Sequence, residues 1–324
     1  MAGETSPAAV VSRRGIIKRP RLTHMLDESG ARIILLVAPA GYGKTTLAHE
    51  WLEDKRAAWY RGSHASADVA ALAVGLASAA SEVVPNAGDR MHQRLRATDR
   101  PEEDAGILAE MLAEDVANWP GNAWLVIDDY QFAMDSPACE EFVDVMCASA
   151  EVKTLIMTRR RPRWATARRR LYGELIEIDR ALLAMNDTEA AAVLGPRGQN
   201  SSELLLEASG WPAVLGLAAL SPLSVLPTDK LPLALYEYFA EELYQAADPE
   251  IRWGLCQLAV PPVLDVDLAS RLLGSAQSSL LLEHAVNLGV LDPREQQQQS
   301  EDCLHIDRDQ KQRIDIKIHY GVTE

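Results

Sequence analysis

Short apolar runs alternate with amphipathic segments along the first half of the chain. Apolar runs of strand length, bounded by polar turns, predict buried parallel strands when helical periodicity separates them. We therefore expect an α/β domain with a parallel sheet and helices on both of its faces. The predicted strands are Ile33–Val37, Ala58–Arg61, Ala123–Asp129, Lys153–Thr158 and Leu175–Ile178.

The segments between these strands have the spacing of helices. Leu47, Trp51 and Leu52 would share one helical face directly after the first strand. Pro101, followed by acidic residues, is typical of a helix start, whereas the stretch before it is polar and carries no predicted helix. The predicted helices are Thr45–Leu52, Ala67–Val84, Pro101–Asn118 and Pro137–Ala148.

Helices dominate the second half of the chain. Asn186 with Glu189 forms the pattern of a helix N-cap, and Gly210–Pro212 predicts the end of one helix and the start of the next at the proline. Three prolines between 222 and 232 indicate a linker. The expected organisation is an N-terminal arm (1–22), an α/β domain (23–180), a small helical domain (181–232) and a last domain (233–324).

A predicted phosphate-binding loop, Ala38–Thr46, follows the first strand. The pattern G-x-x-x-x-G-K-S/T is matched except that Ala38 replaces its first glycine, while Gly41 adds a second flexible point. Backbone N–H groups of such a loop surround phosphates, the lysine reaches them, and the hydroxyl holds Mg²⁺. The alternative is a glycine-rich turn with a solvated lysine. The predicted nucleotide-binding residues are Ala40, Gly41, Tyr42, Gly43, Lys44, Thr45 and Thr46.

Charged residues follow two other predicted strands. Asp128 and Asp129 end an apolar strand, where an acidic pair can hold Mg²⁺ and polarise a water beside a γ-phosphate. We assign Asp128, with Thr45, to the metal and Asp129 to the water; an ordinary turn is the alternative. Arg159 follows the next strand and could sense the γ-phosphate. The predicted catalytic residues are therefore Lys44, Asp128, Asp129 and Arg159. The further arginines up to Arg170 favour a solvated helix face over a second site.

Composition and charge indicate an ordinary globular protein and argue against a nucleic-acid-coating one. The 324 residues have 48% hydrophobic and 24% charged residues, as in ordinary globular proteins, and a formal net charge of −15. That charge argues against a surface built to coat nucleic acid, so we do not expect direct DNA binding. The four cysteines are widely spaced, which favours buried reduced thiols in the cytosol. No signal peptide and no membrane span are predicted, and we expect a cytoplasmic protein.

Taken together, these motifs resemble those of the MalT-type signal-transducing ATPases of the STAND class, bacterial regulators of which many end in a LuxR-type DNA-binding domain. The resemblance rests on the phosphate loop, on Leu125–Tyr130, on Thr158–Arg160 and on Gly210–Pro212, and it covers roughly residues 16–290. It implies that Pro212 lies beside the nucleotide base and that the leading segment with Arg19 runs past the adenine pocket.

The resemblance also implies a switch. In this family a P-loop domain, a small helical domain and a winged-helix domain close over ADP, and ATP with an inducer opens them into an oligomer. The region 233–324 would then be a winged-helix-like domain, with Leu304–Asp309 departing from the family's closing segment. Family members continue into a helical-repeat sensor and a helix-turn-helix, so we expect this chain to represent the core without them.

Three functions remain open on these residues. The first is a regulatory ATPase core that binds ATP or ADP with Mg²⁺, hydrolyses ATP slowly and self-associates in the ATP state. The second is a nucleotide-binding interaction module that does not turn over, because of Ala38 and the altered closing segment. The third is an AAA+-like enzyme that remodels nucleic acid, which the acidic net charge disfavours.

Overall fold

The computed structural model describes residues 17–195, 208–220, 249–258, 264–274, 278, 281–282, 292–293 and 313–315. The chain divides into two compact units, residues 1–215 and 216–324. The candidate site belongs to the first unit.

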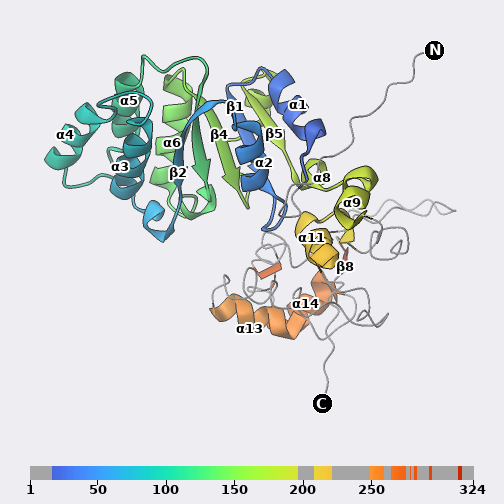
Figure 1. Ribbon diagram of the computed structural model, residues 1–324. Coiled ribbons are helices and arrows are strands. Elements are labelled where there is room, and N and C mark those ends of the chain that lie inside the picture. Colours follow the sequence, from blue (N-terminus) through green and yellow to red (C-terminus); the bar gives the residue numbers. More distant parts are fainter. Residues whose placement is uncertain are drawn as a thin grey trace, which may run out of the picture. The chain divides into compact units, whose positions relative to one another are not determined.

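A five-stranded parallel sheet forms the centre of the first unit (Figure 1). Its strand order is β2-β3-β4-β1-β5, so β1, which precedes the phosphate loop, lies between β4 and β5. Because all strands are parallel, their carboxyl ends share one edge of the sheet. The strands are β1 (Ile33–Val37), β2 (Arg56–Arg61), β3 (Ala123–Asp128), β4 (Lys153–Thr158) and β5 (Leu175–Ile178).

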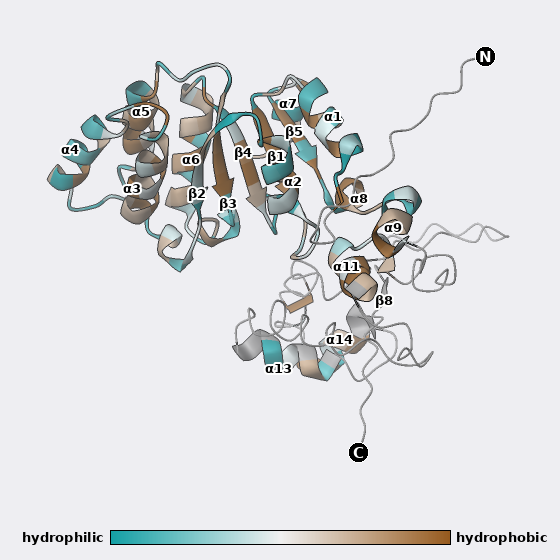
Figure 2. Cartoon of the chain, viewed as in Figure 1, coloured by the Kyte–Doolittle hydropathy of each residue, from teal (hydrophilic) through white to brown (hydrophobic). Residues whose placement is uncertain are grey.

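Both faces of this sheet are buried. Ile33 and Leu35 pack into one apolar cluster with α3, α5 and α6, whereas Ile34 and Leu36 pack into a second cluster with α1 and α2. The central strands are accordingly hydrophobic along their length (Figure 2). The predicted α/β fold with covered faces is confirmed. The helices of the unit are α1 (Pro20–Glu28), α2 (Lys44–Trp51), α3 (Val69–Ala80), α4 (Asp89–Ala97), α5 (Ala105–Asp115), α6 (Pro137–Ser149), α7 (Ala167–Leu171), α8 (Arg180–Leu183) and α9 (Asp187–Leu194).

The helices between β2 and β3 differ from the prediction. The polar stretch before Pro101 contains α4, and the predicted helix start at Pro101 is wrong, since residues 101–104 form a turn and α5 begins at Ala105. Helix α4 is mostly hydrophilic (Figure 2) and buries Met91, and Arg94 pairs with Asp104 of the turn at 2.8 Å. Tertiary contacts therefore decide this region more than local pattern does. Of the predicted helix 67–84, the structure forms α3, and Ala67 instead ends the 3₁₀ turn η1 (His64–Ala67).

The chain after β5 bears out two local predictions. Asn186 and Glu189 form the predicted capping box of α9. Helix α11 (Pro212–Leu220) begins at the predicted proline, after Gly210 with a φ of +72°. A side chain at Gly210 would place its Cβ 2.5 Å from the carbonyl oxygen of Met185, so this turn requires glycine.

The second unit is described only in part. Its elements include a three-stranded antiparallel sheet of order β6-β8-β7. The predicted linker between 222 and 232 and most of the predicted winged-helix-like domain, including Leu304–Asp309, lie outside the described residues. The described elements are α13 (Pro249–Leu258), β6 (Leu264–Asp265), α14 (Val266–Leu273), β7 (Asp292–Pro293) and β8 (Arg313–Asp315).

Two general expectations concern the whole chain. Among the described residues, none of the helices combines the length and the apolar character needed to traverse a bilayer. Cys139 and Cys147 are buried free thiols as predicted, but Cys256 is exposed on α13, and Cys303 lies outside the described residues. The prediction of buried thiols is therefore wrong for Cys256.

Candidate functional site

The phosphate loop connects β1 to α2 at the carboxyl edge of the sheet. Gly41 and Gly43 have φ values of +78° and +76°, which favour glycine, and the Gly43 carbonyl accepts the N–H of Leu47 at 2.8 Å to begin the helix. Ala38 has no such backbone, and its methyl group is buried in the second apolar cluster. The alanine that replaces the first glycine of the pattern therefore fits its position without strain.

Lys44 lies back over the start of its own loop. Its Nζ donates hydrogen bonds to the carbonyl oxygens of Ala38 at 2.6 Å and Pro39 at 2.9 Å. Burial lowers the pKa of Lys44 to about 8, helped by the charge of Arg159 and opposed by Asp128 and Asp129. The predicted lysine, arginine and both aspartates are therefore close enough to influence one another.

Thr45 and Asp128 connect the loop to the end of β3. The Thr45 hydroxyl donates to Oδ2 of Asp128 at 2.9 Å, and Oδ1 of Asp128 accepts the backbone N–H of Asp129 at 2.9 Å. Asp128 is 7% exposed, and burial, followed by the neighbouring Asp129 charge, raises its pKa. A desolvated carboxylate beside a hydroxyl is a pair of oxygen donors suited to Mg²⁺.

Asp129 adopts a left-handed backbone with a φ of +54°. One carboxylate oxygen receives Nε of Arg61 at 3.3 Å, and the other receives Nε2 of Gln131 at 2.9 Å. The turn packs against Gly62, where a Cβ would lie 2.5 Å from the Asp129 carbonyl oxygen. Arg61, Gly62 and Gln131 were not predicted from the sequence; a glycine directly after the arginine that ends β2 was the signal available.

Arg159 follows β4 directly, one strand away from the acidic pair. Val37 pairs with Thr158, and the N–H of Ala38 bonds the Thr158 carbonyl at 3.2 Å, so Arg159 and the phosphate loop leave the sheet side by side. Five further arginines of this segment are engaged with carboxylates, whereas Arg168 lies over the ring of Tyr172. These ion pairs are Arg160–Asp135, Arg161–Glu177, Arg163–Glu140, Arg169–Asp144 and Arg170–Glu177.

The start of α11 contacts the other side of the phosphate loop. The indole of Trp211 stacks on Tyr42, with ring centroids 5.7 Å apart, and donates to the Ala40 carbonyl at 3.2 Å. The N–H of Ala213 donates to the Gly41 carbonyl at 3.0 Å, so Pro212 lies between two residues that touch the loop. Arg180 of α8 donates to the Tyr42 hydroxyl at 2.8 Å.

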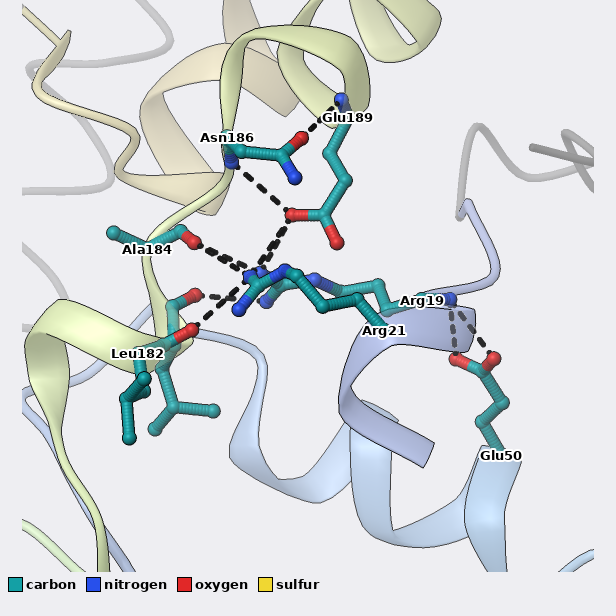
Figure 3. A network of polar contacts seen from close by, with 8 residues as sticks. Arg19, Arg21, Glu50, Leu182, Ala184, Asn186 and Glu189 are labelled. Carbon is teal, nitrogen blue, oxygen red and sulfur yellow. Dashed lines mark hydrogen bonds and ion pairs between the residues drawn. The ribbon is translucent and has the colours of Figure 1, made fainter. Parts of the chain in front are cut away.

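Arg19 lies in a separate polar network (Figure 3). Its guanidinium donates to the carbonyls of Leu183 at 2.8 Å and Ala184 at 3.0 Å, and pairs with Glu189 at 2.9 Å. Its backbone N–H donates to Glu50 of α2 at 2.9 Å. The Arg19 side chain therefore joins the chain before α1 to the connection between α8 and α9. Of the predicted site residues, the structure brings together Lys44, Thr45, Asp128, Asp129 and Arg159. Thr46 is exposed in the first turn of α2.

Comparison with known proteins finds relatives with similar sequences. No family model matches the chain. The HTH-type transcriptional regulator MalT of Vibrio cholerae is 27% identical over 292 residues, which are 85% of this chain and 32% of that protein. MalT of Yersinia pestis is 28% identical over 313 residues, covering 90% of this chain and 34% of that protein. The chain thus spans about a third of the length of these curated relatives.

A solved structure supports the fold. The Walker-type ATPase of Pyrococcus abyssi superposes with a TM-score of 0.51 and 15% identity, covering 90% of this chain and 95% of that one. The predicted resemblance is therefore confirmed: over most of its length the chain is similar in sequence to the MalT transcriptional regulators, and its fold is similar to that of a Walker-type ATPase.

Proposed function

We propose that this chain is the nucleotide-dependent switch core of a MalT-like regulator, binding ATP and ADP with Mg²⁺ and hydrolysing ATP slowly. The observation that carries the proposal is the 2.9 Å bond between Thr45 and Asp128, which joins the phosphate loop to the acidic pair. The two segments are far apart in sequence, and their meeting at the carboxyl edge of a parallel sheet is typical of phosphate-binding sites.

The phosphates would bind at the amino end of α2. Backbone N–H groups of the loop around Gly41 and Gly43 and the positive end of the helix dipole favour an anion there. Lys44 adds a positive charge beside the loop. An incoming phosphate would compete with the carbonyls of Ala38 and Pro39 for its Nζ. Tyr42 and Pro212 would border the rest of the nucleotide.

Thr45 and Asp128 would hold Mg²⁺. Within the described ranges, no group of three or more His, Cys, Asp or Glu side chains is arranged to hold a metal ion. Mg²⁺ commonly uses one or two protein oxygens and completes its shell with phosphates and water, which fits this pair. When bound, the ion would offset the negative charge of the phosphate oxygens.

Hydrolysis would depend on Asp129 and Arg159. Asp129, held by hydrogen bonds at the edge of the sheet, would orient a water for attack on the γ-phosphorus atom and accept its proton. Arg159 would stabilise the charge on the γ-phosphoryl oxygens and thereby distinguish ATP from ADP.

The nucleotide state would reach the rest of the regulator through α11. Trp211 and Ala213 contact the loop backbone, so a change in the loop on nucleotide exchange alters the position of the helix that follows. We propose cytoplasmic localisation, self-association in the ATP state and response to an inducer, as in MalT-type regulators. Direct DNA binding by this chain is not proposed, because its net charge is −15.

The test compares wild type with Lys44→Ala and Asp129→Ala. We expect wild type to bind labelled ATP and ADP, Lys44→Ala to lose binding, and Asp129→Ala to bind ATP but release no phosphate. Asp99→Asn, an exposed change on the loop between α4 and α5, is the matched control. Binding without phosphate release in wild type would replace the proposal by the non-hydrolysing module, and absence of binding would refute both.

A further inference from the structure

Gln131 connects the ends of two neighbouring strands through its side-chain amide. It lies in the 3₁₀ turn η2 (Tyr130–Phe132), directly after the acidic pair. Nε2 donates to Oδ1 of Asp129 at 2.9 Å, and Oε1 accepts the backbone N–H of Arg159 at 3.2 Å. One planar group therefore bridges the two residues proposed to act on the γ-phosphate.

The chemistry of the two partners fixes what the bridge must be. An ionised carboxylate only accepts hydrogen bonds, and a backbone N–H only donates one. The residue between them must therefore donate on one side and accept on the other, which the glutamine amide does in a single orientation. Glutamate of the same shape would accept on both sides and face Asp129 with a like charge, and methionine would make neither strong bond.

The remaining contacts leave Asp129 dependent on this bridge. Its second oxygen pairs with Arg61 at 3.3 Å, but the Arg61 side chain is 82% exposed, and exposed pairs constrain little. The left-handed backbone of Asp129 directs the carboxylate but does not fix its rotamer. On the other side, the same amide fixes the backbone of Arg159 where it leaves β4.

We infer that Gln131 is a positioning residue that holds Asp129 and Arg159 in one arrangement, so that recognition of the γ-phosphate and activation of water depend on each other. This inference rests on the proposed function of those two residues. Gln131 need not touch the nucleotide itself, and ADP, which lacks the γ-phosphate, should bind without its help.

The test uses Gln131→Glu and Gln131→Met, with Gln93→Glu on the exposed side of α4 as the matched control. We expect kcat to fall between about tenfold and hundredfold in both Gln131 variants, as for misplaced catalytic groups. The ratio of ATPγS to ADP affinity should shift towards ADP by about three- to tenfold, while ADP affinity stays within about twofold of wild type. The control should change neither quantity.

A merely structural role would give a different pattern. It would lower the melting temperature and weaken ADP and ATPγS binding alike, which would overturn the inference. The affinity ratio also separates the positioning role of Gln131 from the proposed hydrolysis. If wild type binds both nucleotides but does not hydrolyse ATP, the proposed hydrolysis is refuted, while the ratio still tests the role of Gln131. A ratio unchanged in both variants would overturn the positioning role whatever the hydrolysis rate.

Discussion

Replacing Glu189 by glutamine should destabilise the first unit strongly, although the residue lies outside the proposed catalytic group. Its carboxylate forms ion pairs with the guanidinium groups of Arg19 at 2.9 Å and Arg21 at 3.3 Å. Oε2 also accepts a hydrogen bond from the backbone N–H of Asn186 at 3.2 Å (Figure 3). The side chains of Arg19 and Glu189 are only 7% and 8% exposed. The substitution therefore leaves a buried guanidinium without its counter-ion.

The size of the effect follows from this burial. Removing one partner of a buried pair costs about 3–5 kcal/mol, whereas an exposed pair contributes about 0–1 kcal/mol. Arg19 keeps its bonds to the Leu183 and Ala184 carbonyls, and a glutamine oxygen can still accept from Asn186. We therefore expect a loss near the lower end, about 3 kcal/mol, which is a large part of the stability of a typical domain.

Urea unfolding followed by tryptophan fluorescence measures this loss. Asp187→Asn, an exposed change on the same helix, is the control and should shift the free energy of unfolding by less than about 0.5 kcal/mol. The double variant Arg19→Met with Glu189→Met should be more stable than Glu189→Met alone, because no buried charge remains unpaired. A loss below about 1 kcal/mol for Glu189→Gln would refute the argument from burial.

The pH dependence of the same variant gives an independent check. Burial alone would raise the pKa of Glu189, but the hydrogen bonds and charges of Arg19 and Arg21 outweigh it and hold the pKa below its ordinary 4.5. A lowered folded-state pKa means that the carboxylate stabilises the fold fully above pH 4.5 and that this stabilisation is lost as pH falls through the lower folded value. The difference between wild type and Glu189→Gln should therefore shrink below that pH.

Three further predictions concern the site. Gly62→Ala places a methyl group 2.5 Å from the Asp129 carbonyl oxygen, so phosphate release should fall at least about tenfold and the free energy of unfolding should fall by about 1–3 kcal/mol. The control is Gly121→Ala, where an added methyl group meets no atom within 4 Å. Lys44→Met should weaken ADP binding in equilibrium titration at least about tenfold; an unchanged affinity would contradict the role of Lys44 in phosphate binding. Trp211→Ala should remove the Tyr42 stack and increase proteolysis at the start of α11 in the nucleotide-bound protein; unchanged cleavage would contradict the proposed coupling.

The sheet can be predicted from the sequence because each strand is marked by its own short run of apolar residues. The five apolar runs form the five strands, and the residues that follow β1, β3 and β4 meet because parallel strands end at one edge. The same pattern fails for α4, which is too polar to stand out and is held by Met91 and by the pair between Arg94 and Asp104. Local propensity carries no information about partners that the fold supplies.

The candidate site shows the same division. Lys44, Thr45 and Asp128 belong to motifs with fixed spacing, so their meeting could be predicted. Gly62 and Gln131 matter through contacts across strands, which no spacing reveals. The resemblance placed Arg19 beside the adenine pocket, but it cannot show that the guanidinium is engaged with Glu189, because that depends on how the chain after β5 returns to α1.

The most direct test of the account is the Mg²⁺ dependence of nucleotide binding, measured by calorimetric titration of ATPγS with and without the ion. We expect Mg²⁺ to strengthen binding to wild type at least about tenfold. Thr45→Val, which removes the hydroxyl 2.9 Å from Asp128, should abolish this gain while binding without Mg²⁺ stays nearly unchanged. Failure of wild type to bind ATPγS, or a gain from Mg²⁺ that survives in Thr45→Val, would contradict it.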